Sequence, residues 1–268
     1  MKLRHFSFLL IVLLFVFASC SKFQKIQKST SIVEKYDAAV KYYKAGDYYR
    51  AGLLFEELIP LMRGKKEAED TEFYYAYCQY YQRQLYLSAY YFKKFYQTYP
   101  RSEFAQESHY MHCRSLYESS PRDDLDQSTT KDAMKAIQSY LKKYPKSEFA
   151  DEVQRIYGGL DKKLNKKYFE SAKLYHKIRK YKSAVVSLEN YRKKFPDSQY
   201  NEEAQYLRID AQYHYAKKSV ESKKKERFYE TISLYQEFVD KFPASQYLGE
   251  AEKIYENCLK EIEDYNQS

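Results

Sequence analysis

Four near-identical phrases recur along the chain, and this repetition constrains the fold more than any other feature of the sequence. They read YPRSEFAQES at 99–108, YPKSEFADEV at 144–153, FPDSQYNEEA at 195–204 and FPASQYLGEA at 242–251. Their prolines are 45, 51 and 47 residues apart. Self-similarity at this period indicates stacked structural units, because a unit of this size cannot bury its own apolar face alone.

Each phrase has the chemistry of a corner between two helices. Proline ends the preceding helix because it has no amide hydrogen and its ring clashes with the turn before it. A serine follows each proline by two residues, an aromatic residue by four and a glutamate by seven. We expect the serine to cap the next helix by accepting hydrogen bonds from the free amides of its first turn. The glutamate suits the positive end of that helix.

Small, large and aromatic residues recur twelve, eight and five positions before each proline, which is the spacing of one helical stripe. The segment 166–196 shows the pattern most completely, and it is similar to the tetratricopeptide motif. We therefore predict an all-α superhelical solenoid of about five tetratricopeptide-like helix pairs with a C-terminal capping helix. The pairs are expected near 32–62, 69–100, 103–145, 165–196 and 202–243, and the closing helix near 246–264.

Two irregularities interrupt this array. A polar stretch at 118–132 is expected to form a loop inside the third unit, and 149–165 is expected to add a helical segment before the fourth. Some of the many tyrosines fall on the predicted core stripe. These core tyrosines are Tyr42, Tyr175, Tyr191 and Tyr235.

The N-terminus is typical of a secretion signal. A basic start precedes a mainly apolar stretch of 13 residues at 6–18, with Ser7 as its one polar residue, and this stretch is too short to span a membrane. Cys20 follows the small residues Ala18 and Ser19, and this resembles the bacterial lipoprotein signal, although Phe17 stands where that signal usually has Leu. In such proteins the cysteine becomes the first mature residue and carries acyl chains such as palmitate. The alternative is an ordinary cleaved signal followed by an incidental cysteine.

The chain therefore divides into four predicted parts. Residues 1–19 are the signal peptide, and 20–31 hold the lipidated Cys20 and a flexible tether with few apolar residues. Residues 32–145 form the N-terminal repeats, and 146–268 form the C-terminal repeats with the capping helix.

The remaining cysteines, Cys78, Cys113 and Cys258, are odd in number and scattered, so they do not form a disulfide framework. We expect them to pack as small apolar residues between helices, although one pair could still close.

No catalytic or cofactor-binding motif stands out. The sequence has no Gly-rich phosphate loop, no nucleophile elbow and no HExxH, and we predict a protein that is not an enzyme and binds no cofactor. The nearest metal candidate, His109 with His112 and Cys113, lacks an acidic partner and is interpreted as packing, so no metal site is expected.

The basic segments 162–167 and 218–227 contribute to a formal net charge of +9. Their default interpretation is a solvated helix face, with acidic lipid headgroups or an acidic partner as the alternative. Nucleic acid is excluded as a partner because an exported chain does not meet it.

A group of tyrosines falls where a tetratricopeptide array usually faces its concave groove. Tyrosine offers a large apolar ring with a polar tip at low entropic cost, which suits peptide binding. The alternative is that tyrosine is simply abundant, since the chain has 33. The groove candidates are Tyr36, Tyr43, Tyr77, Tyr80 and Tyr81.

A lipoprotein signal followed at once by five such repeats resembles the BamD family, lipoproteins of the machinery that inserts β-barrel proteins into the outer membrane. The order of the corners, the loop in the third unit and the extra segment before the fourth carry the resemblance. It implies a non-enzymatic scaffold, anchored by its lipid to the outer membrane and facing the periplasm.

The resemblance also implies partners. Residues 32–145 would recognise unfolded outer-membrane β-barrel proteins, and the C-terminal half, near 200–264, would dock the barrel-forming subunit BamA. Other assembly lipoproteins could join. Two alternatives stay open: another exported repeat lipoprotein for envelope maintenance or cell division, and a lipoprotein that captures glycans.

Overall fold

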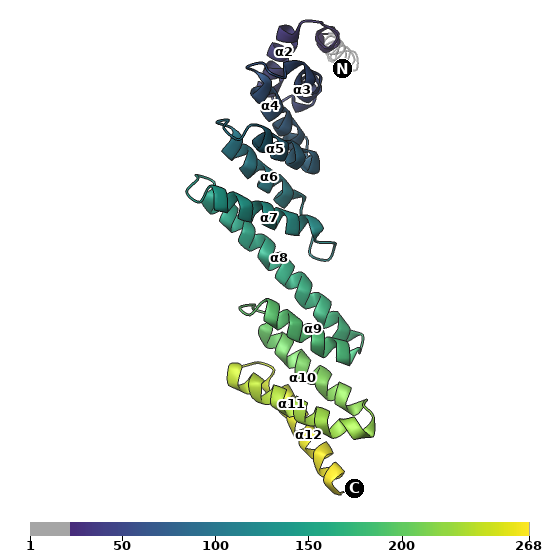
Figure 1. Ribbon diagram of the computed structural model, residues 1–268. Helices are drawn as coiled ribbons and strands as arrows, with labels where there is room; N and C mark the ends of the chain where they lie inside the picture. The colour runs from purple at the N-terminus through teal and green to yellow at the C-terminus, as the bar shows by residue number, and fades with distance from the viewer. Residues whose placement is uncertain (1–21, 268) are drawn as a thin grey trace, which may run out of the picture. The chain divides into compact units, whose positions relative to one another are not determined.

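The computed structural model describes residues 22–267, and the regular structure in that range is entirely helical, which confirms the predicted all-α fold. Consecutive helices pair as the repeats predict (Figure 1). The pairs are α2 (Ile32–Lys44) with α3 (Tyr48–Met62), α4 (Ala68–Tyr81) with α5 (Leu85–Thr98), α6 (Ala105–Ser119) with α7 (Ser128–Lys143), α8 (Ala150–Lys177) with α9 (Tyr181–Lys194) and α10 (Asn201–Lys217) with α11 (Glu221–Lys241), and α12 (Leu248–Gln267) closes the array.

The described residues form two compact units. Unit 1 runs to Pro121 and includes Asp126–Leu160, and unit 2 comprises Arg122–Leu125 and the chain from Asp161 onward. The boundary falls inside α8, because the predicted extra segment 149–165 and the first helix of the fourth pair are one continuous helix. No proline interrupts it, and the adjacent Gly158 and Gly159 are tolerated within it.

Each unit has its own apolar core between helix pairs. In unit 1, Leu54, Phe55 and Leu58 form one cluster, and a second surrounds Phe92 and Ile137. Unit 2 likewise has two clusters, with Phe169, Leu188 and Tyr191 in the first and Phe228, Phe238 and Ile254 in the second. The core therefore lies between neighbouring helices rather than at one centre, as expected for stacked repeats.

The aromatic residue of each corner phrase stacks on a ring from the first helix of the preceding pair. The ring planes are nearly parallel, with interplanar angles of 6–18°. Offset stacking of this kind adds to the free energy gained by burying the rings. The stacks are Phe73–Phe104 at 4.4 Å, Tyr110–Phe149 at 4.3 Å, Phe169–Tyr200 at 4.8 Å and Tyr206–Tyr247 at 4.7 Å between centroids.

The glutamate three residues after each corner aromatic reinforces the same contact. In three corners it binds the residue one helical turn beyond the stacked ring, and in the fourth it accepts from the stacked tyrosine itself. The pairs are Tyr77 with Glu107, Arg114 with Glu152 at 3.3 Å, Lys173 with Glu203 at 2.5 Å, and Tyr206 with Glu250.

The predicted capping role of the corner serines is wrong. In three corners the serine hydroxyl oxygen accepts from the backbone amide two residues on, before the helix begins: Ser102 from Phe104 at 3.3 Å, Ser198 from Tyr200 at 3.1 Å and Ser245 from Tyr247 at 3.1 Å. The corner aromatic occupies the N-cap position of α6 and α10 without a side-chain cap. The serine therefore shapes the turn that presents the aromatic ring.

The turn inside a helix pair is also repeated. Gly46, Arg83 and Arg179 each lie two residues before the second helix of a pair, with φ of 77°, 62° and 58°. An arginine in this left-handed region costs on the order of 1 kcal/mol, so the turn geometry is imposed by the packing of the helices on either side.

Three further sequence expectations differ from the structure or lie beyond it. Residues 22–27, predicted as part of a flexible tether, are helical, and the Phe23 ring packs 5.7 Å from that of Tyr42. The irregular loop of the third pair is shorter than 118–132, because α6 ends at Ser119 and α7 begins at Ser128. Cys20, the predicted lipidation site, lies outside the described residues.

The core prediction holds for Tyr191, which is buried, and Tyr42 and Tyr235 are partly buried. It is wrong for Tyr175, whose side chain is 42% exposed. Within unit 2 no described helix precedes α8, so nothing in that unit covers the ring. Cys78, Cys113 and Cys258 are buried and unpaired, as the packing interpretation predicts.

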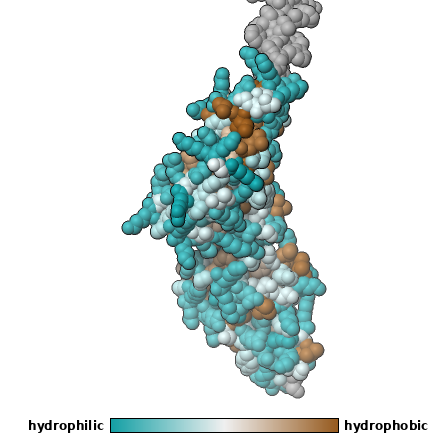
Figure 2. Space-filling model, turned by 45° about the horizontal axis from the view of Figure 1, so that its top comes forward, coloured by the Kyte–Doolittle hydropathy of each residue, from teal (hydrophilic) through white to brown (hydrophobic). Residues whose placement is uncertain are grey.

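Within residues 22–267, none of the helices combines the length and apolar character needed to cross a bilayer. The face seen in Figure 2 is mostly hydrophilic, with small separate hydrophobic patches.

Replacing Phe169 with alanine tests the corner stack. Phe169 is almost fully buried, and its loss should lower the free energy of unfolding by about 3–5 kcal/mol, as buried Phe→Ala changes usually do. Tyr229→Ala is the control because Tyr229 is 52% exposed on α11, and it should change stability by less than about 0.5 kcal/mol. Urea unfolding of both variants measures the difference, and equal effects would contradict the stack's role.

Candidate functional site

The five groove candidates lie on the first helices of the first two pairs, α2 and α4. Tyr77, Tyr80 and Tyr81 share one face of α4, because residues three and four apart are neighbours on a helix. Tyr43 of α2 packs against Tyr74 of α4, with ring centroids 4.8 Å apart. The structure therefore brings both helices' tyrosines into one aromatic region of unit 1.

Tyr36 stands at the α2 position that corresponds to the stacking rings of later pairs. Its hydroxyl donates to Asp70 at 3.3 Å, and residue 67, the counterpart of the corner aromatic, is Glu. Burial and the nearby Asp70 carboxylate raise the pKa of Tyr36 to about 12. Burial raises the pKa of Tyr43 further still. Both tyrosines are neutral at physiological pH and contribute to packing between α2 and α4.

Tyr77 is part of the core. Its side chain is 9% exposed, and its ring lies edge-on to Phe73 and Phe92 with centroids 5.0 Å away in both cases. Its hydroxyl donates to Glu107, and burial followed by this hydrogen bond raises its pKa strongly. A partner in the groove could reach only the edge of this residue.

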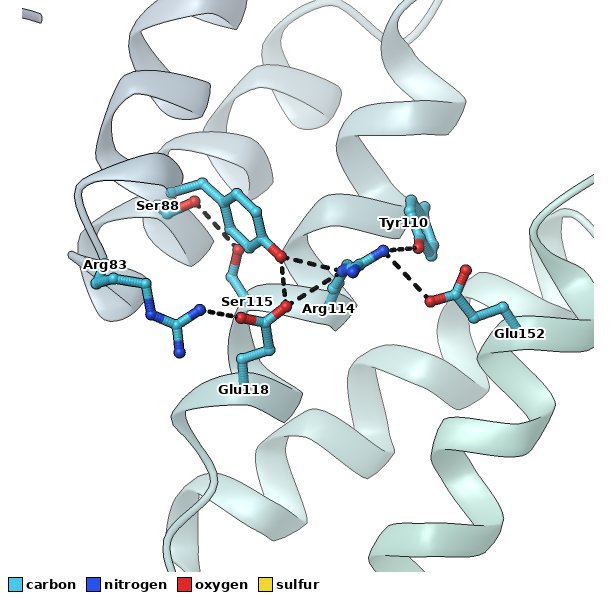
Figure 3. Close-up of polar contacts among 8 residues, drawn as sticks. Arg83, Ser88, Tyr110, Arg114, Ser115, Glu118 and Glu152 are labelled. Atoms are coloured by element: carbon cyan, nitrogen blue, oxygen red, sulfur yellow. Dashed lines mark hydrogen bonds and ion pairs between the residues drawn. The ribbon is translucent and has the colours of Figure 1, made fainter. Parts of the chain in front are cut away.

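Tyr80 belongs to a polar network between α4, α6 and α8 (Figure 3). Its hydroxyl donates to Glu118 and accepts from Nε of Arg114 at 3.0 Å. Arg114 also donates to the Tyr110 hydroxyl at 2.8 Å and to Glu152 at 3.3 Å. Arg83 pairs with the other oxygen of Glu118.

The charges of this network are balanced and fixed. Partial burial alone would raise the pKa of Glu118, but hydrogen bonds from Tyr80, Arg83 and Arg114 outweigh it and hold the pKa below its usual value. Hydrogen bonds that Arg114 donates to Tyr110 and Glu118 likewise overcome the effect of its burial and raise its pKa. Arg114 and Glu118 therefore stay ionised at neutral pH, and the network ties three first helices together.

Tyr81 differs from the other candidates because its side chain is 45% exposed. Its ring stacks on Tyr48 of α3, with centroids 4.2 Å apart and planes 20° from parallel. It also lies 5.8 Å from the ring of Tyr77. Tyr81 and Tyr48 together form an aromatic pair with one ring open to solvent, which is a surface that can pack against an apolar or aromatic side chain.

Sequence reasoning located the tyrosines but not the carboxylates that bind their hydroxyls. Glu107 and Glu152 carry a signal, since both are the repeated glutamate of a corner phrase. Glu118 is not part of a corner phrase, and only its spacing of four residues from Arg114 on α6 hints at a pair.

The chemistry available in this region favours binding over catalysis. Burial raises the pKa of the Cys78 and Cys113 thiols to about 12, so neither is a thiolate at neutral pH. The hydroxyls of Tyr36, Tyr77 and Tyr80 have raised pKa values and donate to carboxylates. What remains open to a ligand is the ring surface.

His109 and His112, considered as metal ligands from the sequence, are packed inside unit 1. His109 stacks on Tyr96 with centroids 4.1 Å apart, and neither of its ring nitrogens has a hydrogen-bond partner. Nδ1 of His112 lies 2.8 Å from the carbonyl oxygen of Ala89, which can only accept, so the proton is on Nδ1. Burial lowers the pKa of each to about 4.

These histidines should make the chain sensitive to acid. Between pH 6.5 and 4 these histidines bind protons in the unfolded state but not in the folded state. The free energy of unfolding is therefore highest above pH 6.5 and falls as the pH drops. His109→Phe keeps a ring against Tyr96 and removes one such group. The stability lost between pH 7 and 4.5 should shrink by on the order of 2 kcal/mol in urea unfolding. An unchanged loss would contradict the buried, neutral state of His109.

The chain can now be compared with known proteins. A model of the YfiO family, described as outer membrane lipoprotein, matches residues 28–186 and again 163–262. The two matches overlap, as expected when successive helix pairs resemble one another. A comparison with curated proteins found no match. Together the matched segments extend from before α2 into α12, and the chain therefore belongs to the YfiO family of outer membrane lipoproteins.

Proposed function

We propose that the chain is a BamD-like scaffold of the outer-membrane β-barrel assembly machinery. It is not an enzyme, and it is held at the periplasmic face of the outer membrane by acyl chains on Cys20. Its N-terminal repeats, 32–145, bind unfolded barrel proteins, and its C-terminal repeats dock the barrel-forming subunit, a BamA-like protein, near 200–264.

Family membership supports a location at the outer membrane, and the sequence around Cys20 supports a lipid anchor. The matched family consists of outer membrane lipoproteins, and Cys20 follows a short apolar signal segment. A single acyl chain binds a membrane only marginally, with about 0.8 kcal/mol for each buried methylene, so several chains on one cysteine are needed for a stable anchor.

The observation that carries the substrate proposal is the aromatic region of α2, α3 and α4. Tyr48 and Tyr81 present stacked rings, and Tyr81 is open to solvent. The carboxylates behind the groove hold the other tyrosines in place, so the surface is preformed. Barrel strands often end in an aromatic residue, and a ring of that kind can pack on the open face of Tyr81.

The proposed docking end is built from α10, α11 and α12. Ala251, Ile254, Cys258 and Ile262 of α12 are buried, so this helix covers the apolar side of the last pair. Most exposed residues of these helices are polar or charged, with Tyr229 and Leu259 among the exceptions, and a polar, charged surface is typical of the rim of a protein–protein interface.

The substrate proposal predicts a specific effect of Tyr81→Ala. A peptide with the C-terminal aromatic strand of a barrel protein should bind this variant about tenfold more weakly, since losing an aromatic contact costs about 1–1.5 kcal/mol. Tyr77→Ala is unsuitable because it also opens the core. Tyr229→Ala, exposed on α11, is the matched control. Fluorescence anisotropy measures binding, and wild-type affinity for Tyr81→Ala would refute the groove assignment.

Affinity purification of the tagged, full-length chain from mildly solubilised envelope tests whether the chain belongs to the assembly machinery. We expect one large barrel protein with periplasmic domains as the dominant, near-stoichiometric partner, identified by mass spectrometry. Cell-wall enzymes in its place would favour envelope maintenance or division, and a sugar importer would favour glycan capture. Either result would overturn the assembly function while leaving the fold intact.

A further inference from the structure

The first helices of four pairs can be compared residue by residue, because the stacking ring marks an equivalent position in each. Five residues beyond that ring stand Cys78 in α4, Ser115 in α6 and Ala211 in α10, and all three are fully buried. The equivalent residue of α8 is Leu174, which is 53% exposed. The largest of the four side chains is therefore the one left open.

In the other pairs, the second helix of the preceding pair covers this face. Gly52 of α3 lies so close to Cys78 that an added Cβ would be 3.4 Å from the Cys78 Cβ. Ser88 of α5 lies 3.1 Å from Ser115, between their hydroxyl oxygens. Glu189 of α9 pairs with Arg208 of α10 at 2.8 Å. Within unit 2 no described helix occupies the corresponding place on α8.

The result is an apolar face on α8 and α9. Tyr175 and Ile178 of α8 are 42% and 52% exposed. Val186 of α9 adds apolar surface at 54% exposed, at a position that is also exposed in α5, where it is Tyr90. Beside them lies a cavity of about 240 Å³. It is lined by Tyr168, Ala172 and Tyr175 from α8 and by Ser187, Asn190 and Lys194 from α9. Clustered exposed apolar residues beside a hollow mark an interaction site on a soluble surface.

The geometry indicates that a helix fills this face. The three equivalent faces each receive one helix, and two adjacent antiparallel helices leave a groove into which the side-chain ridge of a third can pack. Small residues such as Ala172 and Ser187 let such a helix approach closely.

The charges around the face select an acidic occupant. Residues 162–188 contain nine lysines and arginines and one acidic residue, Glu170, although Lys166 and Lys173 pair with Asp123 and Glu203. Near the turn between α8 and α9, Lys177, Lys180 and Lys182 are exposed and form no ion pair with other described residues. At the opposite end the ammonium of Lys194 lies 3.7 Å from the centre of the Tyr168 ring. The chain's own α7 has four lysines and one aspartate, so it lacks the complementary charge.

We propose that this open face of α8 and α9, which we call the helix-docking face, binds an acidic amphipathic helix of a partner protein. The apolar side of that helix covers Leu174, Tyr175, Ile178 and Val186, and its acidic flanks meet the lysines at both ends. The face is separate from the tyrosine groove of unit 1. The inference does not depend on which envelope machinery the chain serves.

Site-specific photo-crosslinking of the full chain in its native envelope tests the helix-docking face. Tyr175 is replaced by p-benzoylphenylalanine, which keeps an aromatic side chain. Tyr90 on α5, which is 60% exposed and lies outside the tyrosine groove and the proposed docking end, receives the same probe as a control. We expect an adduct from position 175 alone. Mass spectrometry of the crosslinked peptide should find a segment with helical apolar spacing and net negative charge.

A charge-reversal variant makes the test decisive. Lys177→Glu, Lys180→Glu and Lys182→Glu together change only exposed side chains, so folding is retained, and circular dichroism checks this. The adduct yield at position 175 should fall at least fivefold. The proposal is overturned by an unchanged yield, by no adduct, or by adducts only with lipid, the chain itself, a second copy or a segment that is not acidic.

Discussion

The stack between a corner aromatic and the first helix of the preceding pair is the contact on which the rest of this structure depends. Four corners use it, with ring centroids 4.3–4.8 Å apart. The proline and serine before each ring set its position, and the glutamate after it reaches the same helix. One short phrase thus fixes both the end of one helix pair and its alignment with the next, which is why the chain repeats that phrase with so little change.

The same corners also organise the candidate groove. Glu107 belongs to a corner phrase and binds Tyr77, and Glu152 belongs to the next phrase and binds Arg114. Two of the candidate groove residues, Tyr77 and Tyr80, are therefore held by the contacts that join the repeats. The hydroxyls of Tyr77 and Tyr80 are bonded to carboxylates, and the ring most open to a ligand is that of Tyr81.

The spacing of the prolines and of the small and aromatic residues was sufficient to predict the helix pairs and the closing helix. The pattern did not predict which neighbouring residues each side chain contacts. Ser102 looked like a helix cap because caps and pre-helical turns favour the same residue types. Tyr175 looked like core because its exposure depends on a preceding helix that unit 2 lacks, not on its own position in the motif. The carboxylate partners of the tyrosines required knowledge of contacts between residues about 30 positions apart.

Because each stack joins only adjacent pairs, every stabilising contact of this kind closes a short loop of chain. The Phe73–Phe104 stack can form once the residues up to Phe104 are available, with no contribution from the C-terminal half. Low contact order of this sort favours rapid local folding. An exported chain emerges from its translocation channel one end first, so this architecture lets each pair fold vectorially on the pair before it. The apolar segments of such a chain are buried by neighbouring segments and do not stay exposed until a distant segment has been exported.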